Sequence, residues 1–211
     1  MKKPPPRSPK ADPLDVIDLD AMLSDEEKDV RAMVRRVATD LCGEHIAQWY
    51  EDGQVPAREL AREFGKAGLL GMHLDGYGCA GMSAVDYGLA SVELEAVDSG
   101  IRSLVSVQGS LAMGAIHMFG SEEHKQQWLP SMAAGEAIGC FGLTEPNHGS
   151  DATWLETRAV RDGDDWVING RKMWITNGTQ ADWLCLLART SDEGGYAGMS
   201  QILVPTSTPG F

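Results

Sequence analysis

The 211-residue chain is acidic, with 18 Lys and Arg residues against 31 Asp and Glu residues and a formal net charge of -13 at pH 7. An apolar fraction of 43% and a charged fraction of 23% are typical of a globular protein. This charge argues against nucleic acid as a partner, and no apolar run approaches the length of a membrane span. Four widely spaced cysteines predict neither a disulfide framework nor a metal site, and no secretory segment is recognised, so a soluble, cytoplasmic protein is expected.

Residues 1–13 contain five prolines and four Lys or Arg residues, which predicts a disordered leader. Helical signals then dominate as far as about residue 134. Ser24-Asp-Glu-Glu27 has the spacing of a capping box, and Pro56 favours the start of a second helix that ends near Gly68. A third helix is capped by Ser83, and its apolar stripe is expected to contain Val85, Leu89, Val92 and Ala96.

A fourth helix is predicted from Ile101 to about residue 119, and its sequence is apolar nearly all round. Such a pattern indicates a buried helix. Arg102 is the only charge in the first four turns, and Ser106 lies one turn on, on the same face. A cation in this setting requires an anion, either a ligand or a neighbour such as Glu95 or Asp98, unless the side chain extends into solvent.

After a fifth helix, capped by Ser121, the period changes to that of strands. Strands are expected at residues 137–144, 155–161, 165–169, 171–176, 183–189 and 200–205. Asp162-Gly163 and Asn169-Gly170 predict hairpin turns. A block of helices followed by a block of strands indicates an α+β fold, with a helical domain over residues 14–135 and part of a β domain over residues 136–211.

Two segments of the strand block carry the strongest functional signal. They are Gly139–Asp151, with the sequence GCFGLTEPNHGSD, and Arg171–Gly178, with the sequence RKMWITNG. The first is an apolar run that breaks into a turn rich in hydroxyl and backbone donors, and the second combines aromatic and β-branched residues. A flat ring with a polar edge requires apolar walls and hydrogen-bond donors along its rim. The pair therefore indicates a flavin site, although either segment alone also fits an ordinary strand–turn–strand unit.

As a spaced pair, these segments resemble the two signatures of the acyl-CoA dehydrogenase family, and the similarity extends from about Leu23 to the end of the sequence. Val97–Gln108, Gly120–His124 and Trp128–Pro130 resemble the glutaryl-CoA dehydrogenase branch. The resemblance implies a helical N-terminal domain, a truncated antiparallel β domain, and the absence of the family's C-terminal four-helix domain. It also implies FAD as the cofactor, an acyl-CoA substrate, an electron-transfer flavoprotein as electron acceptor, and a homotetramer, a dimer of dimers, for the intact protein.

The resemblance further implies roles for particular residues. Flavin contacts are expected from Phe141, Leu143, Thr144, Gly149, Ser150, Trp174, Ile175 and Thr176. Substrate contacts are expected from Glu95, Arg102, Ser103, Ser106 and Ser150, with Arg102 and Ser106 holding the distal carboxylate of a glutaryl chain. Ser150 would contact either the thioester or the FAD pyrophosphate, and His148 is interpreted as a loop surface residue. No residue of this chain is expected to be catalytic, because the family's catalytic Glu is expected beyond Phe211.

The implied activity is FAD-dependent α,β-dehydrogenation of an acyl-CoA thioester by a longer parent enzyme of fatty acid or amino-acid metabolism. Glutaryl-CoA is the favoured substrate, with decarboxylation to crotonyl-CoA. The 211-residue chain lacks the base and is expected to be inactive by itself. Two alternatives stay open: a relative of the acyl-CoA oxidases, and a short non-catalytic chain that binds acyl-CoA or a partner.

Overall fold

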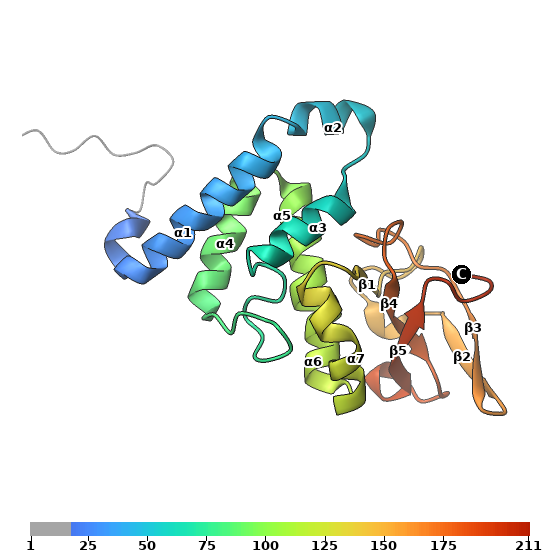
Figure 1. Ribbon diagram of the computed structural model, residues 1–211. Helices are drawn as coiled ribbons and strands as arrows, with labels where there is room; N and C mark the ends of the chain where they lie inside the picture. Colours follow the sequence, from blue (N-terminus) through green and yellow to red (C-terminus); the bar gives the residue numbers. More distant parts are fainter. Residues whose placement is uncertain (1–17) are drawn as a thin grey trace, which may run out of the picture.

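The computed structural model describes residues 18–211, so the disordered leader predicted at 1–13 lies outside the described residues (Figure 1). Helices come first and the sheet second, which confirms the predicted α+β arrangement. The α-helices are α1 (Asp25–Ala38), α2 (Ile46–Asp52), α3 (Ala57–Lys66), α4 (Ala84–Val97), α5 (Ser99–Ser106), α6 (Gly114–Phe119) and α7 (Glu122–Ala133). Shorter turns of 3₁₀ or π type are η1 (Leu19–Met22), η2 (Thr39–Gly43), η3 (Val107–Met113), η4 (Ala152–Trp154) and η5 (Gly195–Gly198).

Local capping signals fix where several helices begin. Ser24 and Ser83 form complete capping boxes, and Ser121 accepts from the third backbone N–H of α7, as their spacing predicts. Helix α5 starts two residues earlier than predicted, because the Asp98 carboxylate accepts hydrogen bonds from the N–H groups of Gly100 and Ile101 at 2.8 and 3.0 Å. Within the described residues, none of the helices combines the length and the apolar character needed to cross a membrane.

The apolar stripe predicted for α4 is wrong in part. Leu89 is buried, but Val85 and Val92 are about half exposed. The buried face instead contains a carboxylate, Glu93, which accepts hydrogen bonds of 2.6–2.9 Å from the guanidinium groups of Arg31 and Arg35 on α1. Helix α4 is therefore rotated to place this charged pairing between the two helices, and apolar spacing alone does not reveal that rotation.

The long apolar helix predicted from residue 101 is observed as α5, η3 and α6 in continuous succession. Its middle part, η3, has π-helical hydrogen bonding, a local widening that often marks a functional segment. Burial is not uniform, contrary to the prediction, since Met118 and Phe119 are 65% and 73% exposed. The N-terminal half of this helix is nevertheless central, because it packs between the other helices and the sheet (Figure 1).

The sheet of the described residues is mixed rather than antiparallel throughout. Its strands are β1 (Gly139–Gly142), β2 (Arg158–Asp162), β3 (Asp165–Asn169), β4 (Trp183–Arg189) and β5 (Met199–Pro205). Strand β4 is central: β5 pairs antiparallel with it along its whole length, whereas β1 and the start of β2 pair parallel with it. The β2–β3 hairpin turns at Asp162-Gly163 as predicted. Parallel pairing requires a long connection between the paired strands, and long segments do separate β1 and β2 from β4 in the chain.

The strand predicted at residues 171–176 and the hairpin turn predicted at Asn169-Gly170 are both wrong. This segment is irregular, and Trp174 and Asn177 have positive φ angles of 60° and 67°. Gly170 is needed for close approach: a Cβ atom there would lie 2.2 Å from the Thr157 hydroxyl oxygen. Tertiary contacts of the segment override the β propensity of its Trp, Ile and Thr residues.

A buried side chain joins the helices to the first strand. Gln108 of η3 is 1% exposed, and its amide nitrogen donates to the carbonyls of Met132 and Ala137 at 3.1 and 2.8 Å. Its amide oxygen accepts from the Gly139 N–H at 2.7 Å. One glutamine thus links η3, the end of α7 and the start of β1, and it fixes the helical part against the sheet.

Candidate functional site

The two signature segments lie side by side in the structure. The Met173 N–H donates to the Thr144 carbonyl at 2.9 Å. The Lys172 ammonium donates to the Leu143 carbonyl at 3.0 Å and to the Glu145 carboxylate at 2.8 Å. The predicted pairing of the segments is therefore made by backbone and side-chain hydrogen bonds between two irregular loops.

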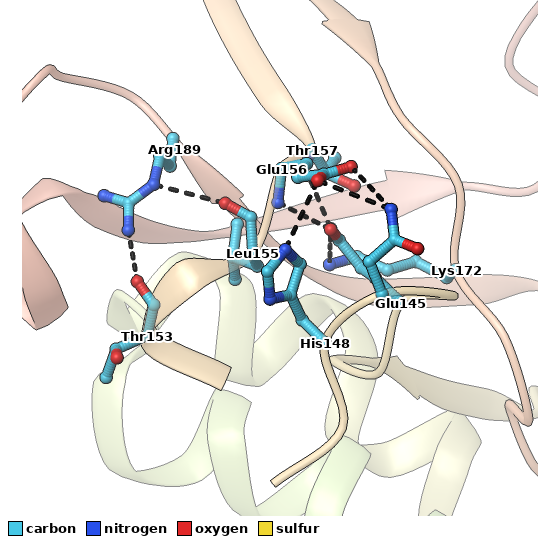
Figure 2. A network of polar contacts seen from close by, with 9 residues as sticks. Glu145, His148, Thr153, Leu155, Glu156, Thr157, Lys172 and Arg189 are labelled. Atoms are coloured by element: carbon cyan, nitrogen blue, oxygen red, sulfur yellow. Dashed lines mark hydrogen bonds and ion pairs between the residues drawn. The ribbon is translucent and has the colours of Figure 1, made fainter. Parts of the chain in front are cut away.

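Glu145 is the buried centre of this junction (Figure 2). Its residue is 4% exposed, and its carboxylate accepts from the backbone N–H groups of Glu156 and Thr157 at 2.5 and 2.9 Å, in addition to Lys172. Burial by itself would raise the pKa of Glu145, but the Lys172 ammonium and the two backbone donors outweigh burial and lower it to about 2. Glu145 is consequently ionised at neutral pH and committed to holding the loop.

The loop that follows Glu145 is held by a second set of contacts (Figure 2). His148 lies on this loop, with its side chain 21% exposed and 3.3 Å from the Glu156 carboxylate. Arg189 of β4 donates to the carbonyls of Leu155, at 3.2 Å, and Thr153. The predicted ligand residues Gly149 and Ser150 are exposed on this loop.

The second signature exposes two of its predicted flavin contacts. Trp174 is 85% exposed although it is a large aromatic residue, and Thr176 is exposed as well, whereas Ile175 is half-buried. The Asn177 side-chain amide donates to the carbonyls of Leu104 on α5 and Gly139 on β1, at 3.4 and 3.3 Å. Asn177 therefore places the exposed Trp174–Thr176 turn beside both the first signature and helix α5.

The predicted substrate residues of α4 and α5 are also brought together. Arg102 donates through Nε to the Glu95 carboxylate at 2.7 Å and through Nη1 to the Ser106 hydroxyl at 3.1 Å. Of the partners considered from the sequence, Glu95 is the one observed, while Asp98 caps α5. Arg102 lowers the pKa of Glu95, with a smaller contribution from Ser99. The side chain of Arg102 remains 35% exposed, so it is accessible to a ligand.

Arg102 keeps donors for a further anion. A guanidinium has five N–H donors, and the hydrogen bonds to Glu95 and Ser106 use one on Nε and one on Nη1. Glu95 binds the side of the guanidinium that carries Nε. The opposite edge, formed by Nη1 and Nη2, is therefore the one suited to a carboxylate of a ligand. Ser103, the remaining predicted contact on this helix, accepts from Ser106 through its carbonyl at 3.3 Å, and its side chain is half-buried.

One cavity of the described residues lies against the sheet. It has a volume of about 610 Å³ and is lined by one face of the sheet, including Cys140, Leu184 and Leu186, and by residues 208–211. Among the predicted flavin residues, only Ile175 lines it. Trp174 does not line this cavity and is exposed in the turn that Asn177 joins to α5.

Sequence reasoning missed four residues that build the site: Gln108, Glu145, Lys172 and Asn177. Each is a polar or charged residue within an otherwise apolar or signature segment, and each is at least half-buried in the structure. Gln108 is a polar residue in an apolar helix, and a buried amide needs hydrogen-bond partners. Its position in the sequence could therefore have predicted a structural role. The pairing of Glu145 with Lys172 spans 27 residues and has no local signal.

The acid dependence of stability provides a test of the Glu145 arrangement. A carboxyl group with a depressed folded-state pKa stabilises the fold fully above its unfolded pKa, near 4.3, and loses that contribution as the pH falls towards its folded pKa, about 2. Glu145→Gln is expected to lower the free energy of unfolding by about 3 kcal/mol at pH 6 and by roughly half of that at pH 3. Urea unfolding of both proteins at several pH values measures this difference, and a pH-independent difference would contradict the assignment.

Comparison with known proteins identifies two domains in this chain. The acyl-CoA dehydrogenase N-terminal domain matches residues 24–136, and the acyl-CoA dehydrogenase middle domain matches residues 140–211. The short-chain specific acyl-CoA dehydrogenase of Rattus norvegicus mitochondria is 36% identical over 88% of this chain and 46% of the relative.

Solved structures give the same result. The crystal structure of glutaryl-CoA dehydrogenase from Mycobacterium smegmatis superposes with a TM-score of 0.89 and 64% identity, over 94% of this chain and 50% of that one. A second structure of a glutaryl-CoA dehydrogenase from the same organism, in complex with FADH2, has a TM-score of 0.89 and 55% identity over the same shares. The chain thus spans about half the length of these relatives. On the matches to both domains, this chain belongs to the acyl-CoA dehydrogenase family.

Proposed function

We propose that the chain forms part of an FAD-dependent dehydrogenase of acyl-CoA thioesters, with glutaryl-CoA as its substrate. The observation that carries this proposal is the position of Arg102 and Ser106 on α5, next to the exposed Trp174–Thr176 turn, to which the helix is joined by Asn177. A cation that can bind a carboxylate and a surface that can bind a flat ring thus lie on adjoining elements. The high similarity to glutaryl-CoA dehydrogenase structures supports the same substrate.

The residues present fit a flavin ring. Trp174 exposes an apolar face from a backbone with positive φ, and such strain in a non-glycine residue is typical of functional sites. Thr176 supplies an exposed hydroxyl, and the half-buried Thr144, whose carbonyl is hydrogen-bonded to the Met173 N–H, supplies a hydroxyl and a backbone N–H. Phe141 and Leu143 add apolar surface, and Gly149 and Ser150 would contact the more polar part of FAD. When bound, FAD would supply the acceptor for the hydride removed from the β carbon of the substrate.

Arg102 would select for a second carboxylate at the far end of the acyl chain. The end-on edge of its guanidinium would bind the carboxylate in a bidentate manner, while Glu95 holds the fork from the side and Ser106 fixes Nη1. A monocarboxylic chain such as butyryl has no group to pair with Arg102. The similarity to short-chain specific dehydrogenases makes butyryl-CoA the alternative substrate, and the contacts of Arg102 are the feature that favours glutaryl-CoA.

Among the carboxylates of the described residues, Glu145 lies in the signature but is engaged by Lys172 and two backbone N–H groups. It therefore does not serve as the base that removes the α proton in this proposal. Transfer of electrons to an electron-transfer flavoprotein, decarboxylation of the product and assembly into a homotetramer are further parts of the proposal. They follow the resemblance to the family.

The flavin site is tested by binding of FAD to the purified chain. We expect FAD fluorescence to be quenched on binding, and Trp174→Ala to weaken binding about tenfold through the loss of one stacking face. Tyr50→Ala is the aromatic control, because Tyr50 is 83% exposed on helix α2 and belongs to neither signature segment. Failure of the wild-type chain to bind FAD, or equal weakening by both substitutions, would contradict the site.

A further inference from the structure

Lys172 and Glu145 form a buried ion pair inside the proposed flavin site, and neither side chain is among the proposed flavin or substrate contacts. Their side chains are 9% and 3% exposed, and their charged atoms are 2.8 Å apart. The pair joins the two signature segments, but the Met173–Thr144 backbone hydrogen bond already joins them at the same place. A buried ion pair is also not required for stability, since well-packed apolar residues often serve as well. The role of Lys172 is therefore sought in its second contact, beyond the joining of the two segments.

That second contact is with the backbone of the first signature. Lys172 donates to the Leu143 carbonyl at 3.0 Å. Lys172 also lines the sheet cavity. The peptide bond between Leu143 and Thr144 is trans, as are the others of the described chain, so its C=O and N–H point in opposite directions. With the carbonyl turned towards Lys172, the Thr144 N–H points away from Lys172.

The next peptide unit is fixed as well, because the Thr144 carbonyl accepts from the Met173 N–H at 2.9 Å. Both peptide units that flank the α carbon of Thr144 are thus anchored to the second signature. The direction of the Thr144 N–H and the starting point of its side chain are set by residues 172 and 173. The positive charge of Lys172 at the Leu143 carbonyl oxygen also polarises the Leu143–Thr144 peptide unit. This polarisation makes the Thr144 N–H a stronger hydrogen-bond donor.

We infer that Lys172 is a positioning residue for the flavin: its ammonium, balanced by Glu145, orients and polarises the Leu143–Thr144 peptide so that the Thr144 N–H donates to the polar edge of the ring. This inference rests on the proposed flavin site. Lys172 itself does not contact the ring. Glu145 allows a cation to be buried at this point without an uncompensated charge, which explains why both charges occur within the signatures.

Lys172→Met is the direct test, because Met has similar length and no charge. The first readout needs no cofactor: the amide proton of Thr144, followed by NMR in the purified chain, is expected to shift upfield when the carbonyl loses its cationic partner. The second readout is the dissociation constant of FAD, which is expected to rise about tenfold for one weakened hydrogen bond. Both are measured at a temperature at which circular dichroism shows the variant to be folded. Lys66→Met is the matched control, since Lys66 is exposed on α3 and pairs with Glu63.

A second variant guards against misfolding of the first. Lys172→Gln keeps a neutral donor for the Leu143 carbonyl, and it is expected to shift the Thr144 amide and the FAD affinity in the same direction by smaller amounts. If both variants melt at lower temperature but leave the Thr144 amide shift and the FAD affinity unchanged, the pair only holds the loops and the inference is wrong. If wild-type protein binds no FAD, the proposed function fails, whereas the amide shift still decides whether Lys172 polarises this peptide.

Discussion

Arg102→Ala is expected to weaken the binding of glutaryl-CoA roughly 100-fold, equivalent to about 3 kcal/mol, because the distal carboxylate loses a charge-assisted, bidentate partner. The remaining groups at this position, the Ser106 hydroxyl and the Glu95 carboxylate, cannot compensate, and Glu95 would repel the substrate. The dissociation constant is measured by calorimetry on the FAD-loaded protein, with the flavin reduced beforehand so that no turnover occurs.

Butyryl-CoA provides the internal control for this substitution. Because it has no distal carboxylate, its affinity is expected to change by less than about threefold, in line with the small effects of surface charges. Arg36→Ala, which removes an exposed guanidinium from the last turn of α1, should leave both affinities unchanged. Equal losses for the two acyl-CoA compounds would mean that Arg102 only supports helix α5, and the proposed choice of a dicarboxylic substrate would be abandoned.

Gln108→Met is expected to lower the free energy of unfolding by about 3 kcal/mol, although Met nearly preserves the volume of the side chain. The substitution leaves the Gly139 N–H and the carbonyls of Met132 and Ala137 without their partner in a fully buried position. Each such group costs about 1–3 kcal/mol when it is not satisfied, and some relaxation reduces the sum. Urea denaturation followed by circular dichroism measures the change.

Gln126→Met on α7 is the control for Gln108, because Gln126 is exposed and makes only a hydrogen bond within its helix, to Glu122. Its substitution should alter the free energy of unfolding by less than about 0.5 kcal/mol. Since Gln108 joins the helices to β1, its loss is also expected to weaken FAD binding. A stable Gln108→Met protein would show that other contacts, such as the pairing of Arg58 with Asp182, suffice to hold the two parts together.

Local signals in the sequence predicted most of the helical part. A capping box is read directly, because Ser and an acidic residue three positions on satisfy two backbone donors wherever the helix packs. The rotation of α4 could not be read in this way, since it depends on Glu93 meeting Arg31 and Arg35 from another helix. Helix α2 was not predicted because it is short and has no buried residue.

The site was predicted as a set of residues but not as a geometry. The two signature segments do lie side by side, and α5 does present Arg102 and Ser106 on one face. The segment around Trp174 was predicted as a strand, because its residues favour strands and the contacts that bend it come from distant positions. Glu145 and Lys172 were missed for the same reason: the energy of a buried ion pair depends on where the fold places both charges.

The visible spectrum of the FAD-loaded protein, titrated with glutaryl-CoA and in parallel with butyryl-CoA, shows whether the flavin and a dicarboxylic substrate bind at one site. A flavin band that is perturbed by acyl-CoA shows that the ring and the substrate share one site. If Arg102 recognises the distal carboxylate, half of the perturbation should occur at a glutaryl-CoA concentration at least about tenfold lower than that of butyryl-CoA. A chain that retains no flavin band would contradict the flavin site, and a band that responds to both compounds at the same concentration would contradict recognition of the distal carboxylate by Arg102.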